Sequence, residues 1–164
     1  MDVLVIKKIP APDNPELAIG AVGEGGVLFW DEDLCQKLCV TEVYKKKIIE
    51  EKTQELKSKI NFFRPRRPSL DLEGKTVVLT DDGVATGATI STAIKVVKKF
   101  KPKQVFLAVP VIALDTLERL KTEVDTVYFL LAPEVFFAVG EFYRNFDQVS
   151  DQEVHEILHL KSYN

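Results

Sequence analysis

The residues best suited to chemistry lie in the stretch 77-VVLTDDGVATGATIS-91. Asp81 and Asp82 follow directly on four strand-like residues, and the hydroxyls of Thr86 and Thr89 come shortly after them. A turn alone needs no pair of acids, and a helix start needs only one capping side chain. Two adjacent carboxylates followed by glycine and hydroxyls therefore predict that a ligand occupies this loop.

The downstream half of the loop is suited to a phosphate. Gly83 and Gly87 let the backbone approach a ligand or take a positive φ. The backbone N–H groups of residues 86–89 open the predicted helix, where they and the helix dipole favour an anion. The hydroxyls of Thr86 and Thr89 add two further donors.

The two acids lie several residues upstream of this anion site. Carboxylates directly against a phosphate would repel it, so we expect them to contact another part of the ligand. At the distance of a sugar, Asp81 and Asp82 can accept hydrogen bonds from vicinal hydroxyls, or hold a metal through its water shell. The alternative is a plain strand-to-helix turn in which Asp82 caps and the threonines satisfy nearby backbone groups. Two acids followed by Thr-Gly-Ala-Thr at the same strand-to-helix junction favour a ribose 5-phosphate site over a plain turn. A Walker-type loop is excluded, because no lysine follows Gly87.

Alternating strands and helices must position this loop. We expect a strand at 75–80 before it and a helix through about Lys99 after it, then a strand at 104–111, a helix at 115–123 and a strand at 126–132. This order predicts right-handed βαβ units and a parallel sheet flanked by helices, an α/β fold. Ligands of such sheets bind beyond the carboxyl ends of the strands. The 164 residues fit a single domain, residues 1–164.

The first part of the chain is less regular. We interpret 3-VLVIKK-8 as a buried parallel strand and 10-PAPDNP-15 as a break in regular structure. Residues 17–34, with GEGG at their centre, predict a small β hairpin. From Asp33 to about residue 60 the spacing is helical, with Thr41 as a plausible N-cap. The apolar face of this helix is thin, which indicates that it lies on the outside of the protein or against a partner, and we expect a homodimer.

The cysteine and histidine content argues against a zinc site. Cys35 and Cys39 lie four residues apart, which predicts two reduced thiols packed on one helix face beside Leu34 and Leu38. A zinc site needs further soft ligands nearby, and the histidines, His155 and His159, lie far away in a tail that we expect to be solvated.

Charge and hydropathy narrow the class of protein. The formal net charge of −3 speaks against general affinity for nucleic acid. The basic clusters 45-KKK-47 and 64-RPRR-67 are either solvated surface or contacts to a phosphorylated ligand or a partner. No apolar run approaches the roughly 18 residues of a membrane helix, and the N-terminus lacks a signal-peptide pattern. We therefore expect a cytoplasmic protein with no membrane contact.

The run VVLTDDGVATGATI closely resembles the signature of type I phosphoribosyltransferases: a hydrophobic strand, two acids, Gly, then Thr-Gly-x-Thr. The segments 2-DVLVIKK-8, NPELAIGAV with GEGG, and VGEFYRNFDQVSD resemble uncharacterised bacterial and archaeal members. The resemblance implies that Asp81 and Asp82 bind the ribose hydroxyls of phosphoribosyl pyrophosphate (PRPP), directly or through Mg²⁺. The residues implied to bind its 5-phosphate are Ala85, Thr86, Gly87, Ala88 and Thr89.

The resemblance also implies roles outside the loop. Lys7 and Lys8 stand where family members place basic residues near the pyrophosphate. The segment 135-VFFAVGEFYRNF-146 is similar to the base-closing region of hypoxanthine-guanine phosphoribosyltransferase, which implies that Phe137 stacks on a base and Arg144 reaches the pyrophosphate. Two alternatives remain open: core packing of Phe136 and Phe137, and an ion pair of Arg144 with Glu141 or Asp147.

The implied activity is transfer of a 5-phosphoribosyl group from PRPP to a nitrogen nucleophile such as a nucleobase, with Mg²⁺-assisted release of pyrophosphate. The alternative is a non-catalytic module that senses PRPP or a nucleotide. Family members usually begin with a strand, a glycine-containing pyrophosphate loop and a helix ahead of the strand that corresponds to residues 3–8. The resemblance thus predicts that this unit is missing and that the sheet lacks a central strand unless another chain or an upstream stretch supplies it.

Overall fold

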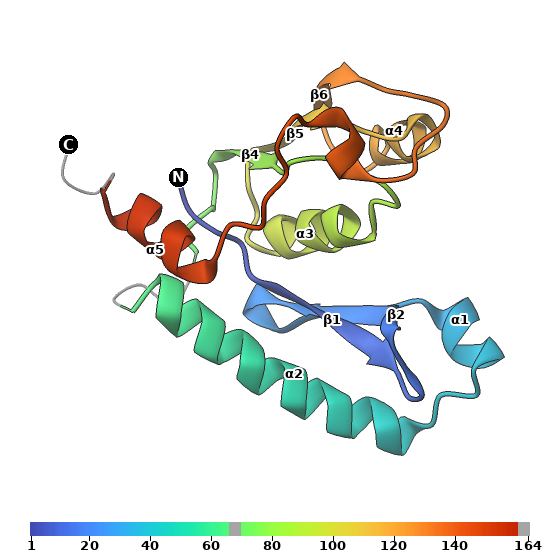
Figure 1. Cartoon of the computed structure of the whole chain (residues 1–164). Coiled ribbons are helices and arrows are strands. Elements are labelled where there is room, and N and C mark those ends of the chain that lie inside the picture. The colour runs from blue at the N-terminus through green and yellow to red at the C-terminus, as the bar shows by residue number, and fades with distance from the viewer. Residues whose placement is uncertain (66–69, 161–164) are drawn as a thin grey trace. The chain divides into compact units, whose positions relative to one another are not determined.

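The computed structural model of the chain describes residues 1–65 and 70–160, with the side chains up to residue 158 (Figure 1). The chain divides into two compact units, Asp71–Val149 and the combination of Met1–Leu70 with Ser150–Asn164. The single domain predicted for residues 1–164 stays a prediction.

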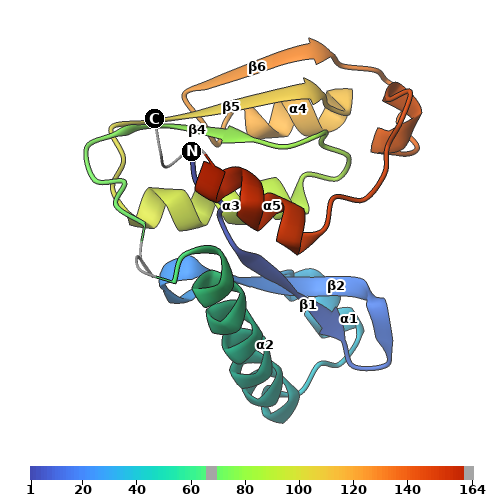
Figure 2. The ribbon, with the colours of Figure 1, turned by 60° about the vertical axis from the view of Figure 1, so that its left-hand side comes forward.

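The unit formed by Asp71–Val149 carries the loop of interest between two of its regular elements. Its elements in chain order are β4 (Thr76–Thr80), α3 (Ala88–Lys99), β5 (Gln104–Val111), α4 (Leu114–Leu120), β6 (Thr126–Leu131) and the short 3₁₀ helix η2 (Val139–Phe142). Strand β5 lies between β4 and β6 and pairs in parallel with both, so the predicted α/β arrangement with a parallel sheet is confirmed. Figure 2 shows α3 and α4 on the same side of this sheet.

One face of the parallel sheet forms the core of this unit. Alternate residues of β5, among them Leu107 and Val109, are buried against Ile90 and Ile94 of α3 and Leu117 of α4. This follows from the two-residue period of the strand and the helical spacing of the α3 apolar face. The helix predicted to run from the loop to about Lys99 is therefore confirmed.

The opposite face of the sheet exposes apolar side chains. Val78 on β4 is 57% exposed, and Tyr128 and Leu130 on β6 are 56% and 81% exposed. Large apolar side chains gathered on one sheet face are the pattern of a surface that packs against another layer. In the described residues β4 is an edge strand of a three-stranded sheet.

The other unit is built on an antiparallel sheet in the order β1-β2-β3, with three α-helices among its described residues. Its elements are β1 (Ile6–Ala11), β2 (Asn14–Gly23), the 3₁₀ helix η1 (Glu24–Gly26), β3 (Val27–Trp30), α1 (Glu32–Lys37), α2 (Glu42–Phe63) and α5 (Asp151–Leu160). The predicted hairpin with GEGG at its turn is confirmed, because β2 and β3 pair on either side of η1.

The first strand differs from its prediction. It spans Ile6–Ala11 and pairs antiparallel to β2, so the interpretation of 3-VLVIKK-8 as a parallel strand is wrong. The proline-rich stretch reverses the chain in a tight turn at residues 12–13 instead of ending regular structure. Pro10 is accommodated at a register shift between Ile9 and Ala11, as is usual for prolines in strands.

The helical segment after β3 is broken. Cys39 adopts φ 51°, a left-handed conformation that ends α1 and leaves its own side chain exposed, while Cys35 is buried. The prediction of two thiols packed on one helix face is therefore wrong for Cys39. Helix α2 starts as predicted, since the Thr41 hydroxyl accepts from the Tyr44 amide at 3.2 Å.

Two basic residues have structural partners in this unit. Lys45 lies 3.4 Å from carboxylate oxygens of both Glu32 and Glu42. Arg64 is buried and forms an ion pair with the buried Glu24, so its interpretation as solvated surface is wrong. The remainder of the 64–67 cluster, Arg66 and Arg67, lies outside the described residues.

The tail helix α5 is less solvated than we expected. The ring of His155 lies 5.0 Å from that of Phe62 and is half-buried, so the prediction of a solvated histidine is wrong. The side chain of His159 lies outside the described part of the chain. Within residues 1–65 and 70–160, no helix combines the length and apolar character that crossing a membrane requires.

Candidate functional site

A loop joins the carboxyl end of β4 to the start of α3, and Val84 anchors its middle. The Val84 amide donates to the Val111 carbonyl at 2.9 Å, and the Ala113 amide donates to the Val84 carbonyl at 2.9 Å. Val84 is buried at 2% exposure. The anchor divides the loop into two parts, which we call the acid turn (residues 81–83) and the threonine turn (residues 85–89).

Gly87 is required in the threonine turn on two counts. Its φ is +70°, in the left-handed region that costs other residues about 1–2 kcal/mol. A Cβ atom there would also lie 2.7 Å from Arg119 Nη2 and 2.7 Å from Thr116 Cγ2. Gly87 is the N-cap of α3, and no side chain caps this helix, so the alternative in which Asp82 caps it is wrong.

The threonine turn offers hydrogen-bond donors with no protein partner. Among the described residues, no acceptor pairs with the amides of residues 86–89 or with the hydroxyls of Thr86 and Thr89. Both threonines are exposed. Unpaired amides at a helix start carry partial positive charge and favour an anion, so the donors suit a phosphate group.

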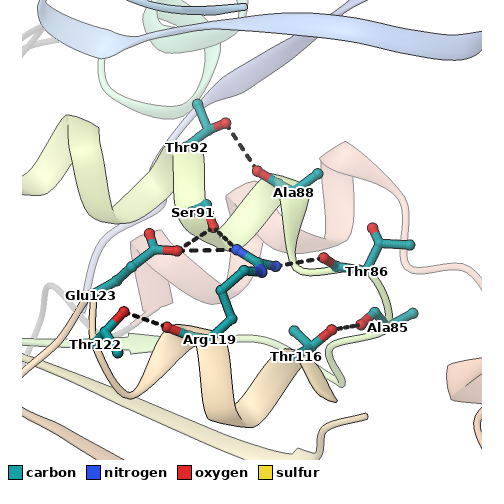
Figure 3. Close-up of polar contacts among 9 residues, drawn as sticks. All are labelled: Ala85, Thr86, Ala88, Ser91, Thr92, Thr116, Arg119, Thr122 and Glu123. Carbon is teal, nitrogen blue, oxygen red and sulfur yellow. Dashed lines mark hydrogen bonds and ion pairs between the residues drawn. The ribbon is translucent and has the colours of Figure 1, made fainter. Parts of the chain in front are cut away.

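Helix α4 holds the carbonyl side of the threonine turn (Figure 3). The Thr116 hydroxyl donates to the Ala85 carbonyl at 2.7 Å, and Arg119 Nη2 donates to the Thr86 carbonyl at 2.7 Å. The other terminal nitrogen of the guanidinium, Nη1, donates to the Ser91 hydroxyl at 2.8 Å. Sequence reasoning missed Thr116 and Arg119, and the only available signal was their three-residue spacing on one helix face.

The acid turn presents its carboxylates to solvent at the end of β4. The Asp82 amide donates to Asp81 Oδ1 at 3.1 Å, and the Tyr143 hydroxyl donates to the Asp82 carbonyl at 2.5 Å. A Cβ atom on Gly83 would lie 2.6 Å from Val139 Cγ1, so this glycine permits the segment around η2 to pack on the turn. Sequence reasoning missed the Tyr143 contact, which no local pattern indicates.

The surroundings of Asp81 disfavour its charge. Partial desolvation by the protein raises the pKa of the Asp81 carboxyl above its ordinary value, the hydrogen bond from the Asp82 amide lowers it, and the neighbouring Asp82 charge raises it. A pair of adjacent carboxylates in this state is stabilised by a cation or by hydroxyl donors. The acid turn is therefore chemically matched to sugar hydroxyls or to a metal.

Two carboxylates are a suitable but incomplete set of metal ligands. No group of three or more histidine, cysteine or acidic side chains that could hold a metal occurs in the described part of the chain. Mg²⁺ usually keeps several waters and binds through one or two carboxylates together with substrate phosphates. Asp81 and Asp82 thus fit an ion that is shared with a phosphorylated ligand.

The predicted residues of the C-terminal segment are available to a ligand. Phe137 is 80% exposed, so core packing is excluded for it, whereas the Phe136 ring lies 5.2 Å from that of Phe142. Arg144 is exposed, and within the described residues it makes no ion pair with Glu141 or Asp147.

Lys7 and Lys8 belong to the other unit, formed by Met1–Leu70 with Ser150–Asn164. Both lie on β1, where Lys7 Nζ is 3.3 Å from a carboxylate oxygen of Glu55. The site that the structure describes is formed by residues of Asp71–Val149. The assignment of the two lysines to a pyrophosphate stays a prediction.

The fold and the loop together define a class of protein: an α/β domain in which two acids and a threonine-glycine turn follow the carboxyl end of a parallel strand. A family model described as "Phosphoribosyl transferase domain" matches residues 8–147, and the chain belongs to this family.

Two relatives carry a phosphoribosyl transferase name, and one solved structure has a similar fold. Proteins of Mycobacterium tuberculosis strains CDC 1551 and H37Rv, each named "Putative phosphoribosyl transferase", are 39% identical over 154 residues, which is 94% of this chain. The crystal structure of TT1426 from Thermus thermophilus is similar with a TM-score of 0.76 and 39% identity, over 96% of this chain and 74% of that one. This chain spans 35% of the length of the two mycobacterial relatives.

Proposed function

We propose that the chain is a phosphoribosyltransferase that transfers the 5-phosphoribosyl group of PRPP to a nitrogen nucleophile, of which a nucleobase is the expected type. The observation that carries this proposal is the division of one loop into a turn of unpaired amides and hydroxyls and a turn of exposed carboxylates. A 5-phosphate suits the first turn and ribose hydroxyls suit the second. Membership of the phosphoribosyl transferase domain family supports it.

The residues of the loop have distinct tasks in this proposal. The amides of the threonine turn and the hydroxyls of Thr86 and Thr89 hold the 5-phosphate, which fixes the sugar in position. Asp81 and Asp82 accept hydrogen bonds from the ribose hydroxyls. As the bond from C1 to pyrophosphate breaks, positive charge develops on the sugar ring, and the two carboxylates stabilise it electrostatically.

A Mg²⁺ ion held at the acid turn would supply positive charge against the pyrophosphate group. Asp81 and Asp82 would hold this ion, directly or through its water shell.

Four further residues are proposed to contact the substrates. The exposed ring of Phe137 is free to stack on the acceptor base, which contributes about 0.5–1.5 kcal/mol beyond burial. Arg144 carries an exposed charge for the pyrophosphate, and we assign Lys7 and Lys8 to the same group.

A homodimer also belongs to this proposal, since α2 buries few side chains, namely Ile48, Leu56 and Phe63. Light scattering at micromolar protein tests it, and a monomeric mass would overturn it.

The test of the activity is a transfer assay with Mg²⁺, PRPP and a panel of purine and pyrimidine bases. Release of pyrophosphate together with a nucleoside monophosphate supports the proposal, and the Asp81→Asn/Asp82→Asn variant is the control that should lose the signal. Binding of PRPP without turnover of any base would reject the transferase and leave a module that senses PRPP.

A further inference from the structure

We propose that Thr116 and Arg119 of α4 are positioning residues, which aim the phosphate-binding amides of the threonine turn at the ligand. The inference rests on the proposed function, because it assigns the 5-phosphate to this turn. Neither side chain needs to touch the phosphate. Both act on the carbonyl side of the peptide groups whose N–H sides face the ligand.

The planarity of the peptide group links the two sides. In a trans peptide the C=O and N–H bonds point in opposite directions. Thr116 holds the Ala85 carbonyl at 2.7 Å, so the N–H of Thr86 in the same peptide points away from α4. Arg119 holds the Thr86 carbonyl at 2.7 Å, so the N–H of Gly87 points away from α4 as well. Two consecutive amides are thus directed to one side of the loop.

Arg119 is itself fixed by two other contacts. Its Nη1 donates to the Ser91 hydroxyl at 2.8 Å and to Glu123 Oε1 at 3.0 Å, while the Ser91 hydroxyl donates to the same Glu123 oxygen at 3.0 Å. Figure 3 shows the guanidinium between Glu123 and the Thr86 carbonyl. This arrangement leaves Nη2 aimed at the loop. A hydrogen bond from a charged donor to the carbonyl also polarises that peptide group and strengthens its N–H as a donor.

The close approach of Gly87 to α4 depends on the same two residues. The space that a Cβ would need at Gly87 is occupied by Arg119 Nη2 and Thr116 Cγ2. The left-handed φ of Gly87 and the contacts of Thr116 and Arg119 therefore form one arrangement that sets the direction of the turn.

The chain offers a matched control for Thr116. Thr122 also donates its hydroxyl to a backbone carbonyl, that of Arg119 at 2.8 Å, but this carbonyl lies at the end of α4 and not in the loop. Thr116→Val and Thr122→Val thus remove the same kind of hydrogen bond with the same change of side chain. Lys121→Ala, which breaks an ion pair with Glu118 at 2.7 Å, is a second control on this segment.

The experiment is calorimetric titration of the whole chain with PRPP in the presence of Mg²⁺, and with ribose 5-phosphate. We expect Thr116→Val to weaken both ligands about two- to tenfold, which is the range of one neutral hydrogen bond, and Thr116→Ser to restore them. Arg119→Gln should weaken both about ten- to a hundredfold, since a charged donor is lost. Arg119→Lys should retain only part of the affinity for both ligands. The ammonium group of lysine lacks the planar set of donors with which a guanidinium reaches several acceptors at once.

A purely structural role would show in stability and not selectively in binding. If Thr116→Val and Thr122→Val lower the unfolding temperature equally while only Thr116→Val weakens the ligands, the positioning role is supported. Unchanged affinity in both Thr116→Val and Arg119→Gln would overturn it. So would a loss of affinity in Thr122→Val as large as that in Thr116→Val.

A second measurement works without any ligand and separates the two proposals. In ¹⁵N-resolved NMR spectra, Thr116→Val and Arg119→Gln should shift the amide signals of Thr86 and Gly87, whereas Thr122→Val should not. If the unaltered chain binds neither PRPP nor ribose 5-phosphate, the proposed function fails, while these amide signals still decide whether α4 orders the turn. Unchanged amide signals in both variants would overturn the inference.

Discussion

The two ends of one short loop are built in different ways. In the acid turn the chemical groups are side chains, the exposed carboxylates of Asp81 and Asp82, and the backbone has one outside support, the Tyr143 hydroxyl. In the threonine turn most of the groups are backbone amides, and α4 supports the carbonyls behind them through Thr116 and Arg119. Val84 lies between the two turns and ties both to the end of β5.

This difference predicts which kind of substitution damages each end. In the acid turn the charge belongs to side chains, so a substitution that removes charge should weaken ligand binding strongly. A substitution that changes only backbone freedom should weaken binding less. In the threonine turn most donors belong to the backbone, so a change of backbone conformation should weaken ligand binding strongly. Removal of a single supporting side chain should weaken binding less. The following variants test that contrast, in order of decreasing effect.

The largest effect is expected for the double substitution Asp81→Asn/Asp82→Asn. Each hydrogen bond from a ribose hydroxyl to a charged group contributes about 1.5–3 kcal/mol, so loss of both charges should weaken Mg²⁺-PRPP binding by roughly a hundredfold or more. Calorimetric titration measures this change. Full affinity in the double variant would contradict the role of the acid turn.

The next effect concerns Gly87→Ala, with Gly74→Ala as its control. Both glycines have positive φ, +70° and +67°, but a Cβ on Gly74 meets nothing within 4 Å. Backbone strain should cost both variants about 1–2 kcal/mol of unfolding free energy, and Gly87→Ala should lose more because its Cβ would also meet Thr116 and Arg119. Only Gly87→Ala should also lose PRPP affinity, about tenfold or more, since the threonine turn must move away from α4. Equal PRPP affinity in the two variants would remove the distinction between the turns.

A smaller effect separates function from stability at Asp81. Because the folded state raises the pKa of this acid, the folded protein holds the proton more tightly than the unfolded chain does. The contribution of Asp81 to stability is therefore largest below the pKa that this acid has in the unfolded chain. It falls as the pH rises to the higher pKa of the folded protein, and it stays low above that pH.

We accordingly expect Asp81→Asn to raise the unfolding temperature slightly at neutral pH, while it weakens PRPP binding. The gain should vanish in acid, where Asp81 is protonated in both states. Thermal unfolding between about pH 3 and 8 checks this, with Asp71→Asn as control, since Asp71 pairs with Lys75 at 2.6 Å and its loss should bring no gain. A loss of stability in Asp81→Asn at neutral pH would contradict the sign.

The smallest effect is expected for Tyr143→Phe. This change removes one hydrogen bond to the Asp82 carbonyl and leaves the ring, so it should cost about 0.5–1.5 kcal/mol, or a two- to tenfold loss of PRPP affinity. Tyr128→Phe, on the exposed face of the sheet, is the matched control and should bind as the unaltered chain does. Equal affinity in the two variants would show that the segment around η2 does not order the acid turn.

The sequence predicted the parts of this site that depend on local patterns. The apolar strand before Asp81, the helical spacing of Ile90 and Ile94, and the alternation of strands and helices are properties of short windows, and the structure reproduces them. The two acids and the hydroxyls could be identified because nothing in a simple turn requires them.

What could not be predicted depends on contacts between distant positions. Arg119 reaches Thr86 across 33 residues and Tyr143 reaches Asp82 across 61, and no local pattern specifies such pairs. The direction of β1 was also missed. A short apolar run looks the same in a parallel and an antiparallel sheet, so only the turn at residues 12–13 decides its partner.

The most direct test of the account is calorimetric titration of the unaltered chain with Mg²⁺-PRPP, with Asp82→Asn and Thr86→Val titrated in parallel. The account predicts saturable binding by the unaltered chain, with weaker binding in both variants, because each variant removes a contact at one end of the loop. Absence of binding, or binding that neither substitution changes, would contradict the assignment of this loop to a sugar phosphate.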